Sequence, residues 1–215
     1  MATAKATRAA AEKWALPARQ ARSRATQAKL LTAAEHVFAE NGYAGAKLSD
    51  IAERAGVSVG AVYFRFKDKD ALFQAIAESF AEEARARLGE FVLEGHAHTS
   101  EAVIRNFVLR TAKNFRTHRG LFRAIVERGF EHARVLDVMF TFRSEIARAF
   151  EGVLRARGAR PGEIGDAVRV ATQMIYGFML IDIINPAAPT RRNTHAAVAG
   201  LADAVSAYLL TVIEP

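Results

Sequence analysis

Apolar residues recur at spacings of three and four through nearly the whole chain, and this pattern limits the fold more than any other feature of the sequence. Such spacing places apolar side chains on one face of an α-helix, and no stretch of four to eight residues alternates as a half-buried strand does. We therefore predict an all-α protein with a small front domain and a larger back domain, joined through one long helix. The expected helices run from about residue 30 to Gly42 and then over residues 48–55, 58–66, 68–93, 100–117, 120–129, 132–157, 161–184 and 194–213.

The positive charge of the chain is concentrated in its front third. Residues 1–70 hold 12 Lys and Arg against 7 Asp and Glu, whereas the remainder holds 18 against 16, for a formal net charge of +7. An excess confined to one part of a chain indicates an anionic partner for that part.

Composition excludes several classes of protein. With 51% apolar residues in 215, the chain is long and apolar enough to bury a core, which excludes general disorder. The absence of cysteine excludes disulfides and thiolate metal sites, and it fits a reducing, cytoplasmic compartment.

Residues 1–24 carry six Lys and Arg against Glu12 alone, so we expect a basic, flexible arm that is either a solvated tail or a contact for nucleic acid. The arm has no continuous apolar core of the kind that a secretory signal needs. The longest strongly apolar run, residues 174–184, contains Asp182 and falls short of the ~20 residues that cross a bilayer. We therefore expect a soluble protein without membrane contact.

The stretch AGVSVGAVYFRF at 55–66 predicts two short helices joined by a sharp turn. Gly56 can take a positive φ without a side-chain clash, and Ser58 can accept a hydrogen bond from a free N–H at the start of the second helix. Val59, Gly60 and Ala61 would keep that end of the helix slim enough for the ~12 Å major groove of DNA. The pattern is that of a helix-turn-helix with a recognition helix.

Aromatic and basic residues follow this slim end. Tyr63 and Lys69 could reach phosphates, through a hydroxyl and a charge respectively. A helical hairpin with a glycine turn also occurs in proteins that bind no DNA. The aromatic residues before KDKD at 67–70, together with the basic arm, favour DNA binding.

Residues 26–80 resemble the DNA-binding region of the tetracycline-repressor-like (TetR) transcriptional regulators. The likeness runs through KLLTAAEHVFAENGY and LSDIAERAGVSVGAVYFRFKDKDALF, and it includes the family pattern Gly-Val-Ser-x-Gly at 56–60 with Tyr63, Phe66 and Lys69. It implies an N-terminal three-helix helix-turn-helix domain and a C-terminal helical domain for ligand binding and dimerisation, about nine helices in all. We expect the arm over residues 1–24, the DNA-binding domain over 25–70 and the effector-binding and dimerisation domain over 71–215.

The resemblance also assigns residue roles. Val59, Gly60 and Ala61 correspond to positions that read bases, and Tyr63 and Lys69 to positions that meet phosphates. Phe64 replaces the commoner His at a phosphate position, and since it cannot bond to a phosphate we expect it to pack instead. The predicted DNA-binding residues are Lys47, Ser49, Ser58, Val59, Gly60, Ala61, Tyr63, Phe64 and Lys69.

Two of these positions lie at the start of the helix over 48–55. The family usually has Thr where Ala46 and Lys47 stand. Lys47 cannot cap a helix as Thr does, but it could hold a phosphate, and Ser49 stands where relatives can reach DNA.

Phe, Met and a few polar residues of the back domain could line an apolar pocket, because several share one face of the helix over 100–117. The alternative is that Phe and Met at helical spacing form plain core. His96 and His98 make a weak pair without evident partners, so we predict no metal and no cofactor. The candidate ligand-binding residues are Phe107, Thr111, Asn114, Phe115, His118, Met139, Phe142, Gln173, Met174 and Phe178.

The last two helices are candidates for a homodimer interface. Residues 174–184 are apolar nearly all round, and the final helix is rich in Ala and Gly, which permits close helix approach. Burial within a single chain would also explain this composition, and the resemblance favours the dimer.

The resemblance implies a sequence-specific transcriptional regulator: a homodimeric repressor on double-stranded DNA with a palindromic operator, released by a small-molecule effector. An activator or an effector-independent DNA-binding protein would use the same contacts, and a ligand-binding or catalytic helical bundle is the remaining alternative. The sequence shows no Ser/His/Asp set, no paired carboxylates in an apolar setting and no phosphate-binding glycine loop, so we predict no catalytic residues and no enzyme.

Overall fold

The computed structural model describes residues 2–95, 98–159, 161–185 and 194–213, and every regular element within these ranges is helical. This confirms the all-α prediction. The elements are α1 (Ala2–Gly45), α2 (Leu48–Ala55), α3 (Val59–Tyr63), α4 (Lys69–Gly95), α5 (Ser100–Thr117), α6 (Arg119–Arg128), the 3₁₀ turn η1 (Gly129–Glu131), α7 (Ala133–Arg155), α8 (Pro161–Ile184) and α9 (Thr194–Ile213).

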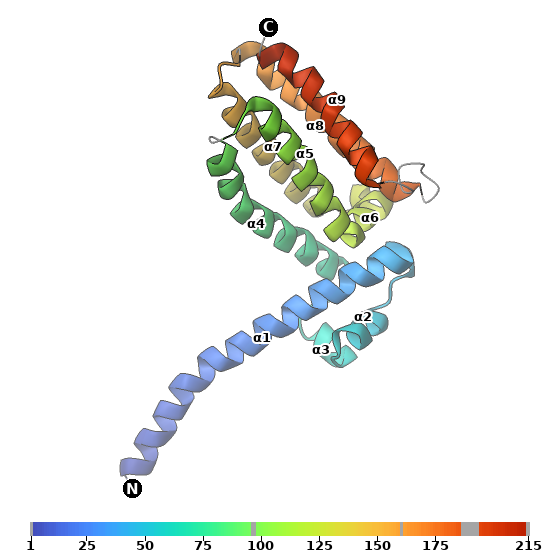
Figure 1. Cartoon of the computed structure of the whole chain (residues 1–215). Helices are drawn as coiled ribbons and strands as arrows, with labels where there is room; N and C mark the ends of the chain where they lie inside the picture. Colours follow the sequence, from blue (N-terminus) through green and yellow to red (C-terminus); the bar gives the residue numbers. More distant parts are fainter. Residues whose placement is uncertain (1, 96–97, 160, 186–193, 214–215) are drawn as a thin grey trace.

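Helix α1 crosses beneath the bundle of α4 to α9, with α2 and α3 on its other side, and its N-terminal half projects away from the body (Figure 1). Residues 2–24, expected as a flexible arm, continue this helix. The segment is rich in Ala, Arg and Lys, whose high intrinsic helix propensity favours the helix against the effect of Pro17. Near its other end the helix breaks at Gly42 (φ 71°, ψ 173°), where the sequence predicted that it stops.

The front domain packs α1, α2 and α3 against the first turns of α4. Each of these helices turns its apolar side chains toward a common centre, so these side chains are buried together. Phe73 of α4 packs edge-on against Phe38 of α1, with ring centroids 6.2 Å apart. The front core therefore extends beyond residue 70, and α4 belongs to both domains. The fully buried residues of the front core include Leu30, Ala34, Phe38, Ile51, Val62, Leu72 and Phe73.

Helix α3 is shorter than the predicted range of 58–66. Backbone N–H groups of Phe64, Arg65 and Phe66 still bond to carbonyls three or four residues earlier, but as isolated turns. The chain leaves the helix there because Phe66 turns into the core, at 6% exposure, and α4 begins at Lys69.

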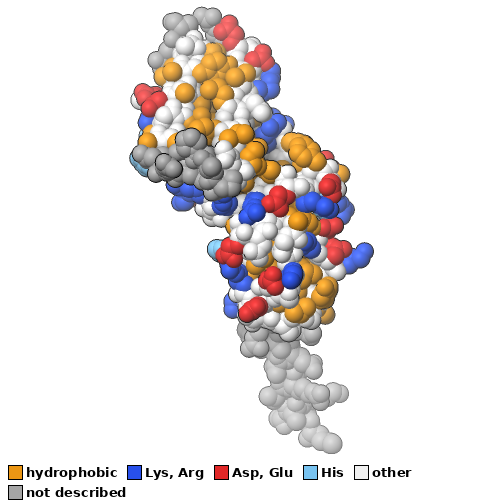
Figure 2. Space-filling model, turned by 90° about the vertical axis from the view of Figure 1, so that its right-hand side faces the viewer, with side chains coloured by type: hydrophobic (Ala, Val, Ile, Leu, Met, Phe, Trp, Pro, Cys, Tyr) orange, Lys and Arg blue, Asp and Glu red, His pale blue; other side chains and the backbone are white. Residues whose placement is uncertain are grey.

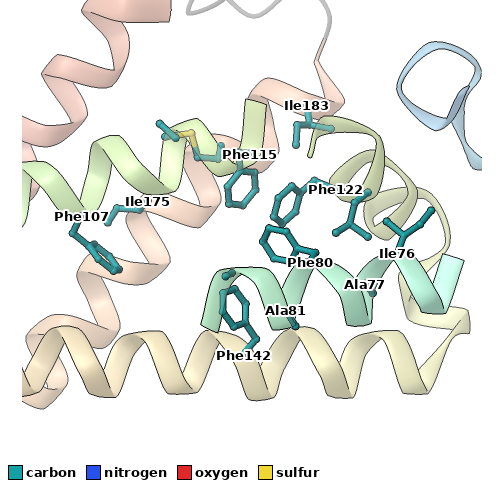
Figure 3. Close-up of a cluster of buried hydrophobic side chains, with 14 of the residues drawn as sticks. Ile76, Ala77, Phe80, Ala81, Phe107, Phe115, Phe122, Phe142, Ile175 and Ile183 are labelled. Atoms are coloured by element: carbon teal, nitrogen blue, oxygen red, sulfur yellow. The ribbon is translucent and has the colours of Figure 1, made fainter. Parts of the chain in front are cut away.

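The back domain is a helical bundle with an aromatic centre (Figure 3). Phe115 of α5 stacks on Phe122 of α6 at 3.8 Å between centroids. Phe80 of α4 meets Phe122 and Phe142 of α7 edge-on, each at 5.4 Å. This arrangement fixes α4, α5, α6 and α7 around one cluster of rings.

Helices α1 and α6 make an unusually close crossing. A Cβ added to Gly120 would lie 1.8 Å from the backbone oxygen of Glu35, so only glycine fits there. Next to it, Nδ1 of His118 lies 3.2 Å from both carboxylate oxygens of Glu35. The front domain is thus held directly against α6.

Side chains of α6 also cap the end of α1. Arg123 donates from Nη1 to the carbonyls of Ala39 (2.8 Å) and Glu40 (3.1 Å). The carboxylate of Glu127 accepts from the N–H of Tyr43 at 2.6 Å and from Nε of Arg123 at 2.8 Å. These bonds satisfy backbone groups that a helix end leaves without partners.

Helices α8 and α9 form the outer layer of the bundle. By length and mean hydropathy, residues 162–184 and 194–213 could each cross a membrane. Each instead buries one face, including Ile175 of α8 and Val205 of α9, against the other helices. Figure 2 shows hydrophobic side chains along the opposite, outer face of this layer. Its large exposed members on α8 are Val170, Met174, Ile181 and Ile184.

Candidate nucleic-acid interface and ligand cavity

The turn between α2 and α3 has the geometry that its sequence predicts. Gly56 adopts a left-handed conformation (φ 67°, ψ 38°), which a residue with a side chain rarely takes. Ser58 has extended backbone, and its hydroxyl accepts from the N–H of Ala61 at 3.2 Å. The cap begins α3 at a defined residue and fixes its direction.

The two faces of α3 differ sharply in exposure. Val62 is fully buried, whereas Val59 is 42% exposed and Tyr63 57%. Gly60 is exposed and Ala61 half-buried, so the N-terminal end of the helix is slim on its outer side. The outer face carries no large side chain before Tyr63 that would stop it from approaching another surface.

Phe64 is the most exposed large hydrophobic residue in the described part of the chain, at 85%. It does not pack into the protein. The guanidinium of Arg65 lies 5.8 Å from its ring centroid, and Nη1 of Arg65 donates to the carbonyl of Ala61 at 3.1 Å. Arg65 and the exposed Lys67 add positive charge beside α3. The sequence analysis did not single them out, although both stand within the basic stretch that it quoted.

The start of α2 lies close to α3 in sequence and is also exposed. Lys47 is the residue before the helix, with extended backbone and no side-chain cap, as expected for lysine. The hydroxyl of Ser49 donates to the carboxylate of Asp50 at 3.0 Å. Both Lys47 and Ser49 are exposed and can meet a partner.

Lys69 has a role inside the protein that differs from the predicted phosphate contact. Its ammonium donates to the carbonyls of Tyr43 (2.7 Å), Ala46 (3.0 Å) and Ala44 (3.4 Å), which close the end of α1. It also lies 4.6 Å from the centroid of the Tyr43 ring. Burial lowers the pKa of Lys69. With three donors committed, a phosphate could bind it only by displacing one carbonyl.

Tyr43 completes this cluster. Its hydroxyl donates to the carboxylate of Asp70, and burial followed by this bond raises the pKa of Tyr43. The last turn of α1 and the first turn of α4 are therefore tied by polar contacts, in addition to the apolar core.

A cavity of about 390 Å³ lies between α4 and α5, with Ile146 of α7 contributing to its wall. It brings together four of the ten predicted ligand-binding residues: Phe107, Thr111, Asn114 and His118. The volume falls within the ~300–1,000 Å³ of small-molecule sites. Since α4 and α5 run antiparallel, Phe91 and Phe107 lie at one end of the cavity and Ala84 and His118 at the other.

The other six predicted residues lie elsewhere. Phe115 and Phe142 are buried in the aromatic core, where ring packing uses their faces. Met139 packs half-buried against that core, and Gln173 and Met174 are on the outer face of α8. Phe178, with Phe115, borders a cavity of only about 30 Å³ between α5, α8 and α9.

Eight lining residues were missed by the sequence analysis, and three of them are charged: Arg87 of α4, and Arg110 and Lys113 of α5. Arg110 stands three residues after Phe107 and four before Asn114, so helical spacing alone could have placed it on the predicted face. Arg87 and Lys113 carry no such signal, because their positions depend on how α4 and α5 are rotated against each other.

His118 closes the end of the cavity nearest to α1. Its ring packs edge-on against Phe80 at 4.8 Å between centroids. Because His118 also contacts Glu35 of α1, it touches both the cavity and the front domain.

No cluster of three or more metal-ligating side chains occurs within the described ranges. Of the weak histidine pair, His98 is exposed and His96 lies outside the described residues.

Comparison with known proteins agrees with this geometry. The family model for bacterial regulatory proteins of the tetR family matches residues 30–76, which span α2, α3 and the adjoining parts of α1 and α4. The HTH-type transcriptional repressor BepR of Brucella suis is 32% identical over 166 residues, covering 72% of this chain and 78% of BepR. The HTH-type transcriptional regulator UidR of Escherichia coli K12 is 32% identical over 120 residues, covering 56% of this chain and 60% of UidR.

Solved structures share the fold. A TetR-family transcriptional regulator from Mesorhizobium loti superposes with a TM-score of 0.72 at 21% identity, covering 89% of this chain and 98% of its own. GusR of Salmonella enterica gives 0.63 at 18% identity, covering 88% and 96%. At these identities the likeness concerns the arrangement of helices alone.

Proposed function

This chain belongs to the TetR family of bacterial regulatory proteins, and we propose that it is a homodimeric repressor that a small-molecule effector releases from a palindromic operator. Its membership makes it a DNA-binding transcriptional regulator with a helix-turn-helix, and it is not an enzyme. The observation that carries the proposal is the exposed outer face of α3, supported on a buried inner face. As a regulator of transcription it would work in the cytoplasm.

In this proposal α3 is the recognition helix. Val59, Gly60 and Ala61 lie against base edges in the major groove, where slim side chains allow close approach. Ser58 holds the helix start in place, and its hydroxyl is committed to that cap. The exposure of Val59 supports this assignment, because a buried side chain could not reach a base.

Residues around the recognition helix would bind the DNA backbone. Tyr63 can donate to a phosphate through its exposed hydroxyl, and Phe64 can pack on the sugars. Lys47 and Ser49 would meet a second stretch of backbone at the start of α2. Lys69 would act mainly by holding the end of α1, in view of its three carbonyl partners.

The outer face of α8 and α9 is the proposed dimer interface. Exposed Val170, Met174, Ile181 and Ile184 would be covered by the same face of a second chain, as in a two-fold symmetric interface. On α9 several exposed positions are small, including Gly200, Ala204 and Ala207, and would permit close helix packing. Two recognition helices would then meet successive major grooves about 34–36 Å apart.

The cavity between α4 and α5 is the proposed effector site. An effector there presses on α4, which enters the front core, and on His118, which contacts Glu35 of α1. A shift of either would change the spacing of the two recognition helices. The effector acts only if its affinity differs between the bound and released arrangements.

Selection of bound sequences from a random pool of double-stranded DNA tests the DNA-binding part. We expect enrichment of a palindrome whose half-sites lie about 10 base pairs apart. A variant with Val59→Glu should lose the enrichment, because a carboxylate would face the electronegative groove. Enrichment of unpaired half-sites would contradict the dimer, and an unchanged palindrome with Val59→Glu would contradict the assigned recognition face.

A further inference from the structure

The charges that line the α4–α5 cavity all have one sign. Arg87, Arg110 and Lys113 contribute to its wall, and no Asp or Glu is among its lining residues. One of the three is compensated from outside: Arg110 forms an ion pair with Glu94 and donates from Nε to Asn106 at 3.1 Å. These bonds hold its guanidinium 6.0 Å from the centroid of Phe91, at the edge of the cavity.

The other two cations form no ion pair in the part of the chain that the structure describes. Within the described ranges, neither Arg87 nor Lys113 has an acidic partner. They stand on α4 and α5 respectively, and both are exposed, which places them where the cavity opens to solvent. A site with two unpaired cations attracts an anion and repels a cation.

The apolar part of the cavity wall is firmly held. Phe107 stacks flat on Phe150, at 4.0 Å between centroids and 4° between ring planes, and Phe91 packs beside both. With Leu88 and Ile146, the rings of Phe91 and Phe107 give the cavity a fixed apolar surface. A ligand body that fills it must be apolar.

Thr111 and Asn114 of α5 add polar groups to the lining. The hydroxyl of Thr111 donates to the carbonyl of Phe107 at 2.9 Å, which leaves it free only to accept. Asn114 is half-buried, and its amide can donate to an oxygen of the ligand.

We infer that the cavity binds an organic acid: an apolar, aryl-sized body against Phe91 and Phe107, and one anionic head group held by Arg87 and Lys113, with Asn114 as a further donor. The inference rests on the proposed effector function and names the chemical class of the effector. Charge-assisted bonds from two cations select the acid over its neutral analogue, and the positive charge of the unpaired side chains disfavours the corresponding amine.

Isothermal titration calorimetry of the full chain with three matched probes tests this: 2-naphthoate, 2-naphthylmethanol and 2-naphthylmethylamine. All three have the same aromatic body, and only the charge of the head group differs. We expect 2-naphthoate to bind at least tenfold more tightly than the alcohol, and the amine not to bind. Equal affinity for the acid and the amine, or no binding of the acid, would overturn the inference.

Variants locate the site. The double variant Arg87→Gln, Lys113→Gln should bind 2-naphthoate at least tenfold more weakly and the alcohol as before. Arg134→Gln removes an exposed arginine on α7 that lies outside the cavity lining and serves as the control. Unchanged acid binding by the double variant, with its helical circular dichroism intact, would place the acid elsewhere.

The titration contains no DNA, so its result is separate from that of the operator selection. A chain that selects a palindrome but binds none of the acid retains the proposed function and loses this inference. A chain that binds the acid at Arg87 and Lys113 but selects no DNA shows the reverse.

Discussion

Ser58 and Phe64 stand at opposite ends of α3 and illustrate how single residues there divide between structure and contact. The hydroxyl of Ser58 accepts a hydrogen bond from the backbone of its own helix, whereas the side chain of Phe64 is almost fully exposed. The first should therefore matter for the stability of the fold, and the second for binding.

Replacing Ser58 by alanine removes the side-chain acceptor for the N–H of Ala61. We expect the free energy of unfolding to fall by about 1 kcal/mol, the usual effect of losing a helix cap. Urea unfolding followed by circular dichroism measures it. Ser49→Ala is the matched control: its hydroxyl bonds only to neighbouring Asp50, so the free energy should change little. An equal loss in both variants would contradict the role of the cap.

Replacing Phe64 by alanine should leave the free energy of unfolding within about 0.5 kcal/mol, because the side chain is exposed. Affinity for the selected operator should fall about tenfold, because the variant loses the packing of Phe64 on the DNA sugars. This fall corresponds to about 1.4 kcal/mol of binding free energy. Fluorescence anisotropy with labelled operator measures the affinity. Phe66→Ala, by contrast, should lower stability by about 3–5 kcal/mol, because Phe66 is buried. Unchanged operator affinity with Phe64→Ala would remove Phe64 from the interface.

Lys69 and Arg87 show where prediction from sequence reaches its limit. Helix positions, the Gly56 turn and the Ser58 cap depend on neighbours in sequence, so local patterns were sufficient to predict them. Lys69 bonds to the carbonyl of a residue 26 positions away, and Arg87 lines a cavity formed by two helices. Their environments follow from tertiary packing, which periodicity does not specify. For the same reason the sequence could not separate Phe107, at the cavity, from Phe115, in the core.

At the scale of the elements, both α4 and α6 link the two domains, but through different contacts. Helix α4 reaches the front core through apolar side chains such as Phe73, whereas α6 contacts α1 through backbone proximity and polar caps. The crossing at Gly120 leaves no room for adjustment, so a small displacement of α6 must displace α1 as well.

A substitution at this crossing should separate the two helices. In Gly120→Ala the added methyl would lie 1.8 Å from the backbone oxygen of Glu35, and the backbone cannot yield as a flexible side chain can. We expect a loss of about 2 kcal/mol or more in the free energy of unfolding, together with weaker operator binding.

The control for this variant is Gly152→Ala on α7. No atom lies within 4 Å of a Cβ added there, so alanine should raise stability by about 0.5–1 kcal/mol through its higher helix propensity. Thermal and urea unfolding of both variants test the pair. A neutral Gly120→Ala variant would show that the crossing is looser than the structure describes.

For the molecule as a whole, the outer face of α8 and α9 decides whether one chain or two approach the DNA. The buried faces of these helices pack against other helices of the same chain, but four large apolar side chains of α8 remain in contact with water. Covering them with a second copy would remove that exposure and supply the second recognition helix that a palindrome requires.

Ile181→Glu introduces a charge at this face, at a side chain that is 56% exposed in the single chain. We expect the folded monomer to remain, with a mass near 23.5 kDa by light scattering, and operator binding to be lost. Leu93→Glu, at a 75% exposed position on α4, is the control and should stay dimeric. A dimer that persists in Ile181→Glu would place the interface on another face.

The caps that α6 supplies to α1 determine whether the DNA-binding domain can be separated from the rest of the chain. Arg123 and Glu127 bond to the last turn of α1, although they lie more than 80 positions further along the chain. A fragment that ends at residue 70, or a chimera that joins this fragment to another protein, would leave those backbone groups without hydrogen-bond partners. Gly42 would also lose its contact with Glu127. Engineers who wish to move the operator specificity of this protein should exchange the outer residues of α3 in place.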